Sequence, residues 1–399
     1  MKKAFNLSIP VILLAILYLS ASCKKSGPDP APATELPVLT CPDITINRTI
    51  SNAVMRFYVN LSKAGTSEAS AKYSLMAGTA LSPRDFTTAT GTVTISSGQS
   101  FGFIDVPITG DSLRQPDLEL TIQFSNPKNC TLGTSSSKGT IVTMDGTYFP
   151  VVDAGYSTPK SYTGYNLTWS DEFTGAPINL NNWNFETGGN GWGNHELEYY
   201  TNSSKNAFIT NGGYLVMEAR KETIGTSNYS SARMQTLGKR EFQFGRIDIR
   251  AILPKGKGVW PALWLLGTNI STTAWPACGE IDMMESLGHE PNKTYGTMHW
   301  GIAGGGSTHT GGNYTLPVED FSQKFHVFSI IWTADKIEWY VDDQKYFTGN
   351  KSDVTGNYPF DKSFFLIFNI AVGGDWPGNP DATTTLPQRM IVDYVRVFQ

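Results

Sequence analysis

Charged side chains are scarce in this chain of 399 residues. Lysine, arginine, aspartate and glutamate together make up 17% of it, against roughly 25% in an ordinary globular domain. The 31 basic and 35 acidic residues leave a formal net charge of −4, and no long basic run occurs. Because nucleic-acid binding needs a basic patch or stripe, no nucleic-acid partner is expected.

Cysteine is equally rare, with four residues at positions 23, 41, 130 and 278. Cys41 and Cys130 bracket one segment, and in an oxidising compartment a bond between them would join its ends. The sequence alone leaves open whether their Cα atoms lie close enough to pair. Cys278 lies two residues before Glu280. We interpret it as a small buried hydrophobe rather than a catalytic thiol.

Long stretches with helical periodicity are missing. Short alternating runs, such as residues 55–59 and 390–398, recur between turn residues instead. Residues 38–147 therefore predict a smaller, immunoglobulin-like β-sandwich. Residues 165–399 predict one large two-sheet sandwich of the jelly-roll type. Residues 148–164 are predicted to link the two, and the fold class is all-β.

The N-terminus has the order of an export signal, predicted over residues 1–22. Lys2 and Lys3 precede an apolar run at residues 9–19, which is shorter than the about 20 residues that span a bilayer. Small residues at 20–22 end the segment. The protein is therefore expected to leave the cytoplasm.

Cys23 follows the small residues directly, an arrangement that resembles a bacterial lipobox. In that case Cys23 would carry a lipid, and residues 23–37, rich in proline, would act as a semi-extended tether. We expect the protein to be exported from a bacterial cell and either lipid-anchored to the outer membrane or secreted. Plain cleavage near Ala21 is the alternative.

Aromatic residues are plentiful, with 10 Trp, 17 Tyr and 21 Phe. Tryptophans in such number suit a surface that stacks on sugars. For any single tryptophan, a place in the core of a β-sandwich is the more common explanation.

Three carboxylates lie within six residues at 280–285, inside a segment typical of a buried strand. Alternation puts Glu280 and Asp282 on one face and puts Glu285 on the other. A β-bulge at Met283 and Met284 would return Glu285 to the acidic face, and bulges are common beside active sites. Such crowding is tolerated where protons are shared. The alternative is an exposed acidic strand face.

From about Leu167 onward the chain resembles glycoside hydrolase family 16, in its bacterial laminarinase branch, which has a concanavalin-like jelly-roll fold. The resemblance rests on Trp169-Ser-Asp-Glu172-Phe173, Gly191-Trp192-Gly-Asn194-His-Glu196, Gly258-Val-Trp260-Pro-Ala-Leu-Trp264, Gly279-Glu-Ile-Asp-Met-Met-Glu285, Met298-His299-Trp300 and Gly373-Gly-Asp-Trp376-Pro-Gly378. It implies a retaining endo-β-1,3-glucanase with Glu280 as nucleophile, Glu285 as acid/base, and Asp282 tuning the nucleophile.

The same resemblance implies further site residues. Sugar contacts are expected from Trp260, Trp264, Trp376, Asn194, Arg233 and His299. A structural calcium ion would involve Glu172, a carbonyl near Gly212, and Asp393, whereas catalysis needs no cofactor. A metal role for His299 is rejected, because no second histidine lies at ligand spacing. The partner is a β-glucan polysaccharide, and the protein is expected to be a monomer.

Residues 82–86, 91–95, 106–108, 122–127 and 139–142 resemble a Calx-beta domain. Such domains often bind calcium through acidic clusters near one end. Only Asp111, Asp117, Glu119 and Asp145 remain there, so calcium is not expected in this domain. We expect the domain to have an accessory or spacer role.

Two alternative functions stay open. One is another family 16 activity, on mixed-linkage glucan, agarose, carrageenan or xyloglucan. The other is a glucan-binding protein that does not cut. Such relatives lose the catalytic glutamates, whereas this chain keeps all three carboxylates.

Overall fold

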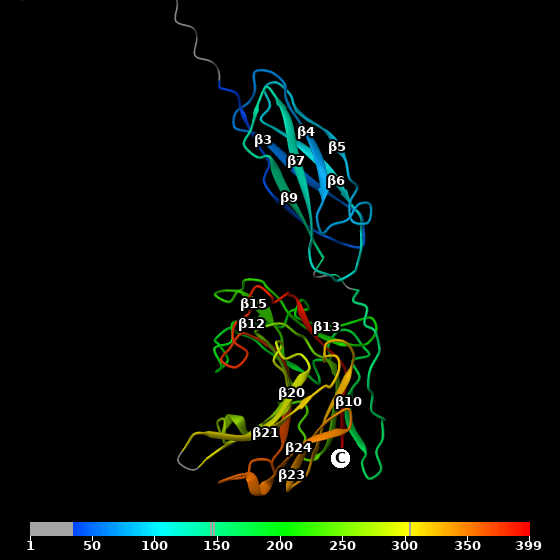
Figure 1. The fold of residues 1–399 in the computed structure, drawn as a ribbon, viewed down its shortest axis with the longest axis vertical. Coiled ribbons are helices and arrows are strands. Elements are labelled where there is room, and N and C mark those ends of the chain that lie inside the picture. Colours follow the sequence, from blue (N-terminus) through cyan, green and yellow to red (C-terminus); the bar gives the residue numbers. More distant parts are fainter. Residues whose placement is uncertain (1–34, 144–145, 147, 303–304) are drawn as a thin grey trace, which may run out of the picture.

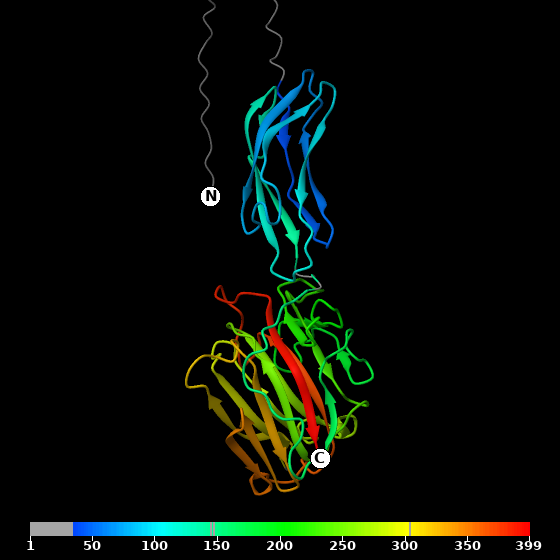
Figure 2. The same ribbon diagram turned by 90° about the vertical axis from the view of Figure 1, so that its right-hand side faces the viewer.

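A computed structural model describes residues 35–143, 146, 148–302 and 305–399. Two β-rich bodies lie end to end along the long axis of the molecule (Figure 1, Figure 2). The predicted export signal, Cys23 and most of the tether lie outside the described residues. In the described part, no helix is long and apolar enough to cross a membrane.

The smaller body is a sandwich of two sheets, as the strand pattern predicted. The first sheet, in the order β6-β3-β1-β8, consists of β6 (Phe101–Ile108), β3 (Ala53–Leu61), β1 (Val38–Thr40) and β8 (Thr131–Leu132). The second, in the order β2-β9-β7-β4-β5, consists of β2 (Ile44–Asn47), β9 (Ser136–Val142), β7 (Leu118–Lys128), β4 (Ala69–Ala77) and β5 (Thr90–Ile95). Alternate residues of β3 and β7 point inward, and Phe57 and Leu120 are fully buried between the sheets.

Cys41 and Cys130 are free thiols, both buried in this core. The register of β1 on β8 explains why they do not pair. The two strands run parallel with Val38 beside Thr131, so Cys130 is level with residue 37 and Cys41 lies four residues further along. At about 3.3 Å per residue the offset is about 13 Å, beyond the reach of a disulfide.

The larger body is a jelly roll of two sheets. The eight-stranded sheet has the order β13-β14-β26-β17-β22-β23-β24, with β10 also on β26. Its strands are β13 (Ala207–Ile209), β14 (Leu215–Ala219), β26 (Gln388–Phe398), β17 (Gly245–Ile252), β22 (His326–Trp332), β23 (Lys336–Val341), β24 (Gln344–Asn350) and β10 (Leu167–Asp171).

The seven-stranded sheet has the order β11-β16-β25-β18-β19-β20-β21. Its strands are β11 (Asn184–Glu186), β16 (Arg233–Gln235), β25 (Phe364–Val372), β18 (Val259–Gly267), β19 (Glu280–Glu285), β20 (Lys293–Gly301) and β21 (Ser307–Thr315). A separate pair joins β12 (Glu198–Tyr200) to β15 (Tyr229–Ser231), and two short 3-10 turns lie at η1 (Thr268–Ser271) and η2 (Lys351–Asp353). The predicted all-β class, a smaller sandwich followed by a jelly roll, is confirmed.

The core of the jelly roll lies between its two sheets. Every residue of β25 is buried, which fits its sequence, apolar except for Asn369, and its place between β16 and β18 inside the seven-stranded sheet. Trp183, Trp332 and Trp339 are fully buried in the same core. These tryptophans therefore stabilise the sandwich rather than contact a ligand.

The segment predicted as a linker, residues 148–164, lies against the larger body. Gly155 forms a bridge with Phe325, and the Tyr162 hydroxyl donates a 2.7 Å hydrogen bond to Asp248 on β17. Between the two bodies, the Arg114 Nε atom lies 3.3 Å from the Glu218 carboxylate on β14, and both side chains are buried. A buried ion pair thus fastens the smaller sandwich to the larger one.

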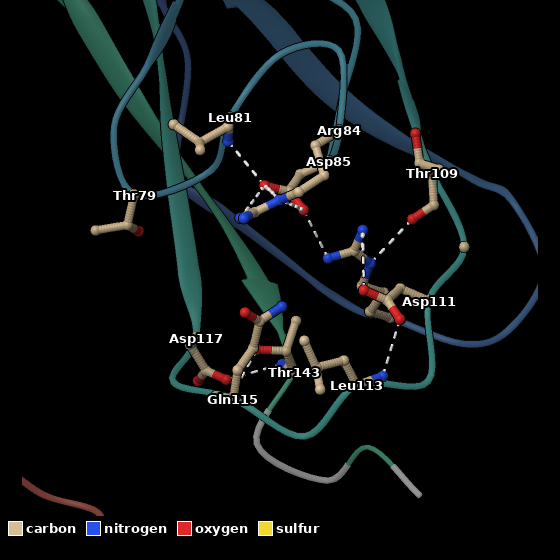
Figure 3. Close-up of polar contacts among 12 residues, drawn as sticks. Thr79, Leu81, Arg84, Asp85, Thr109, Asp111, Leu113, Gln115, Asp117 and Thr143 are labelled. Carbon is tan, nitrogen blue, oxygen red and sulfur yellow. Dashed lines mark hydrogen bonds and ion pairs between the residues drawn. The ribbon is translucent and has the colours of Figure 1, made fainter. Parts of the chain in front are cut away.

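Acidic residues at the end of the smaller sandwich that faces the larger body form hydrogen bonds and ion pairs with other residues of that sandwich (Figure 3). Asp85 is fully buried and accepts hydrogen bonds from Arg48 (2.9 Å), Arg84 (2.7 Å) and the Leu81 N–H (2.8 Å). Asp111 accepts a hydrogen bond from the Leu113 N–H. Arg48 and Arg84 thus neutralise Asp85, and Asp145 lies outside the described residues.

Candidate active site

The three carboxylates of β19 reach one face of the sheet through a β-bulge. Trp264 on β18 is level with Asp282 while Leu263 is level with Met284, so one residue of β19 is extra. The pairing with β20 shows the same shift between Asp282 and Glu285. The predicted bulge is therefore confirmed. Ile281, Met283 and Met284 pack into the core, and the carboxylates point to the other side.

That side is a cleft of about 1000 Å³, in the upper part of the range of small-molecule sites. Its walls come from the seven-stranded sheet and from the loops that carry Trp192, Trp275 and Trp376. Aromatic rings lie on both sides of the carboxylates, and polar groups from β20 and β21 face them. An extended, hydroxyl-rich ligand with apolar faces suits such a lining.

Two indole groups hold the outer carboxylates. Trp260 Nε1 donates a 3.0 Å hydrogen bond to Glu285 Oε1, and Trp275 Nε1 donates a 3.0 Å hydrogen bond to Glu280 Oε2. His299 faces Glu280 across the β19–β20 ladder. Its Nε2 atom lies 3.2 Å from Asp282 Oδ2 and 3.7 Å from Glu280 Oε1.

Crowding on the cleft floor raises the proton affinity of all three groups. Burial, and then the neighbouring charge of Asp282, raise the pKa of Glu280 to about 8, whereas His299, Trp275 and Arg233 lower it. Burial raises the pKa of Asp282 to about 8. Burial and the other two carboxylates raise the pKa of Glu285 well above its usual range. The cluster therefore retains protons at neutral pH and can both donate and accept them.

The structure brings together every residue expected to act on the sugar. The cleft is lined by Glu280, Asp282, Glu285, Trp260, Trp264, Trp376, Asn194, Arg233 and His299. The Arg233 guanidinium lies 4.9 Å from the ring centres of both Trp192 and Trp264, and it pairs with Glu186. Trp264 Nε1 donates to Asn369 Oδ1 at 2.8 Å, so its ring is fixed before any ligand arrives.

Several lining residues were not expected from the sequence: Trp192, Trp275, Tyr295, His309, Asn313 and Asn369. Trp192 follows Gly191 in the same family-like motif as Asn194, and this position was the signal that could have marked it. Trp275 sits on a loop with no periodicity to mark it, and β21 is a polar strand without a motif. Only the pairing of β20 with β21 brings His309 opposite His299.

The residues expected to hold calcium pair with arginines instead. Both oxygens of Glu172 accept 2.8 Å hydrogen bonds from Arg396, and Asp393 accepts a 2.7 Å hydrogen bond from Arg250. A calcium ion takes six to eight oxygen ligands, most of the charge coming from carboxylates. With each carboxylate neutralised by a guanidinium, the arrangement does not fit a calcium ion.

Comparison with known proteins agrees with the geometry. Residues 195–396 match the family model of Glycosyl hydrolases family 16. The chain is 40% identical over 253 residues to the Beta-glucanase of Rhodothermus marinus, covering 59% of this chain and 85% of that protein. It is 38% identical over 272 residues to Glucan endo-1,3-beta-glucosidase A1 of Niallia circulans, covering 62% of this chain and 40% of that protein.

A solved structure supports the same family at higher identity. The laminarinase catalytic domain from Thermotoga maritima MSB8 is 52% identical, with a TM-score of 0.55, over 59% of this chain and 98% of that one. The residues that match the family model all lie within the larger body.

Proposed function

Because this chain belongs to glycosyl hydrolase family 16, we propose that it is a retaining endo-β-1,3-glucanase, active on laminarin-type glucans and also on mixed-linkage β-1,3-1,4-glucan. The observation that carries the proposal is the bulged strand β19, which presents Glu280, Asp282 and Glu285 together on the floor of an aromatic cleft. Retaining hydrolysis needs two carboxyl groups on one site, one as nucleophile and one as acid/base.

In the first step Glu280 attacks the anomeric carbon, and the bond to the glycosidic oxygen breaks. Glu285 gives its proton to that oxygen, so the leaving chain departs as an alcohol. In the second step Glu285 takes a proton from water, and the water oxygen displaces Glu280 from the anomeric carbon. Two inversions leave the product with the β configuration.

The environment of each glutamate supports these roles. Burial and Asp282 raise the pKa of Glu280 to about 8, and His299, Trp275 and Arg233 act against this rise and so favour the ionised form that attacks the sugar. Burial, and then the charges of Asp282 and Glu280, raise the pKa of Glu285 well above its usual range, so Glu285 holds the proton that it gives to the glycosidic oxygen. Asp282, between them, holds their proton affinities apart.

Sugar binding is assigned to the cleft walls. Trp260, Trp264 and Trp376 would stack on sugar faces, while Asn194, Arg233 and His299 would contact hydroxyl groups. Trp376 and Trp260 meet edge to face, with ring centres 5.5 Å apart, and so form one corner of the cleft.

Product analysis on laminarin tests the proposal. NMR recorded in the first minutes should show the β-anomer, and an α-anomer would exclude double displacement. Glu280→Ser should abolish hydrolysis and keep oligosaccharide binding, whereas Glu285→Gln should lower kcat about 10²- to 10⁴-fold, the usual size of a lost general acid. Asp353→Asn, at the far turn η2, serves as the matched acidic control and should hydrolyse normally.

A substrate panel separates the alternatives. Hydrolysis of agarose or carrageenan without laminarin hydrolysis would move the enzyme to another branch of the family. Glucan binding without any hydrolysis would favour a recognition protein.

The rest of the chain supports an exported enzyme. We assign residues 1–22 to an export signal, Cys23 to a lipid anchor, and residues 23–37 to a tether that holds a monomeric enzyme off the outer membrane. The Calx-beta-like sandwich acts as a spacer. Mass spectrometry of the N-terminus of the mature protein tests the anchor.

A structural calcium ion at Glu172, Gly212 and Asp393 is tested by thermal unfolding with and without EDTA, and the arginine pairs there predict no change in Tm.

A further inference from the structure

One of the two catalytic glutamates, Glu280, also belongs to a group of side chains that could hold a metal ion. Glu280, Asp282 and His299 each offer one ligand-type atom, and these atoms all lie within 4.8 Å of one another. Asp282 is 3% exposed, and the side chains of His299 and Glu280 are 24% and 17% exposed toward the cleft. Solvent ions can therefore reach the group from the open side.

The spacing suits a small divalent ion. Bonds from zinc to nitrogen and oxygen are about 2.0–2.2 Å, so tetrahedral ligand atoms lie about 3.3 Å apart. The His299 Nε2 atom is 3.2 Å from Asp282 Oδ2 and 3.7 Å from Glu280 Oε1. Side-chain shifts of a few tenths of an ångström would bring both distances to that value.

An unsatisfied atom points into the same space. Asp282 Oδ2 is buried and accepts no hydrogen bond from the described residues, although His299 Nε2 lies near it. Trp275 donates its hydrogen bond to Glu280 Oε2, and the other oxygen of Glu280, Oε1, is the one that lies near His299. A buried carboxylate oxygen without a donor costs free energy, and a cation would recover it.

We propose that Glu280, Asp282 and His299 form a binding site for a divalent transition-metal ion of the Zn²⁺ or Cu²⁺ type, and that the bound ion inhibits the enzyme reversibly by occupying the nucleophile. One imidazole and two carboxylates select such ions over Ca²⁺ or Mg²⁺, which prefer oxygen ligands alone. The inhibitory half of the proposal rests on the proposed role of Glu280, whereas the binding half does not.

Electrostatics of the floor support an ion there. Three carboxylates share the cleft with two imidazoles, His299 and His309, and Arg233, the nearby guanidinium, pairs with Glu186. The open cleft leaves room for a water molecule as the fourth ligand.

Metal binding is tested first, without reference to activity. Tag-free full-length protein is titrated with Zn²⁺ by calorimetry and with Cu²⁺ by electron paramagnetic resonance. We expect one ion per chain, and nitrogen hyperfine coupling in the Cu²⁺ spectrum. In His299→Gln this coupling should disappear, and the affinity for Zn²⁺ should be at least tenfold weaker. Asp282→Asn should weaken Zn²⁺ similarly, and circular dichroism checks that both variants fold.

The matched control is His195→Gln, because His195 also lies 2.9 Å from an aspartate, Asp375, but is exposed at the rim. It should bind Zn²⁺ as the unmodified protein does. Equal Zn²⁺ affinity in the unmodified protein and His299→Gln, or loss of the ion in His195→Gln, would overturn the site.

Inhibition is tested on laminarin. Zn²⁺ should raise KM without changing kcat, EDTA should restore activity, and the same concentration of Ca²⁺ should have no effect. Full turnover by enzyme with Zn²⁺ bound at His299 would overturn the inhibitory half, and would also remove Glu280 from the nucleophile role. Metal-free enzyme that is inactive on every glucan would defeat the proposed function alone, since the binding measurements would still stand.

Discussion

The indole Nε1 of Trp275 donates a 3.0 Å hydrogen bond to Oε2 of Glu280, the carboxylate assigned as nucleophile. Trp275 lies on the loop before β19 and is 48% exposed. The bond fixes one oxygen of Glu280 and directs the other toward the cleft. Because a hydrogen bond to the charged form favours ionisation, Trp275 also counteracts the rise in pKa that burial causes.

Replacing Trp275 with phenylalanine removes that bond and keeps most of the ring. The pKa of Glu280 should rise further, so the acid limb of kcat/KM on laminarin should move to higher pH, and kcat at neutral pH should fall about tenfold, the value of one hydrogen bond to a charged group. Trp376→Phe is the control, since it should raise KM without moving the acid limb. An unchanged pH profile in Trp275→Phe would contradict the role.

The bulge in β19 gives a test based on strand parity. Deleting Met283 removes the extra residue and keeps Glu285 on the cleft face, so hydrolysis should remain measurable. The deletion removes a buried side chain, and Tm should fall as for a core truncation of about 2–5 kcal/mol. Deleting Met284 as well leaves Glu285 directly after Asp282, so alternation turns Glu285 away from the cleft and kcat should fall at least about 100-fold. Equal activity of the two variants would refute the assigned geometry.

Arg114 and Glu218 should hold the two sandwiches in one orientation. Arg114→Ala removes a buried partner, although Glu218 keeps its 2.6 Å contact with Arg389. We expect a larger radius of gyration by small-angle scattering and faster proteolysis between the domains. Activity on soluble laminarin should not change, because Arg114 is outside the cleft. The control is Arg56→Ala, which breaks the exposed pair with Asp105 and should leave the shape unaltered. Identical scattering curves for all three proteins would show that the contact does not orient the domains.

Asp85 should make the smaller sandwich sensitive to acid. Burial would raise its pKa, but Arg84, the Leu81 N–H and Arg48 outweigh burial and hold the pKa below the ordinary value. A group with a lowered folded pKa contributes stability above its unfolded pKa of about 4, and this contribution is lost as pH falls through the folded value. Asp85→Asn should therefore cost about 3 kcal/mol at pH 7, and less as the pH falls below about 4.

The sequence supplies the probe for that measurement. All 10 tryptophans lie between positions 169 and 376, so tryptophan fluorescence reports the jelly roll alone. Far-ultraviolet circular dichroism should show an earlier transition for Asp85→Asn at pH 7 and 5 and a smaller difference at pH 3, while the fluorescence transition stays in place. A shift in both signals, or a cost that does not depend on pH, would contradict the assignment.

Local rules were enough to predict much of this protein from its sequence. Alternating apolar residues and the lack of helical periodicity determined the all-β class. Parity along residues 280–285 required a bulge if Glu285 was to join Glu280, and the resemblance to family 16, through the motifs around Trp260 and Trp376, implied the cleft residues. Each of these depends on neighbours within one strand or one motif, where side-chain direction follows directly from sequence.

Tertiary structure decided what depends on distant segments meeting. The register of β1 on β8 separates Cys41 from Cys130, a question that the sequence left open. Histidine spacing along the chain argues against a metal role for His299. The β19–β20 ladder nevertheless brings His299 beside Glu280 and Asp282, and the three side chains form a group that could hold a metal ion. Strand pairing and loop position are set by packing over the whole sandwich, and no local pattern encodes them.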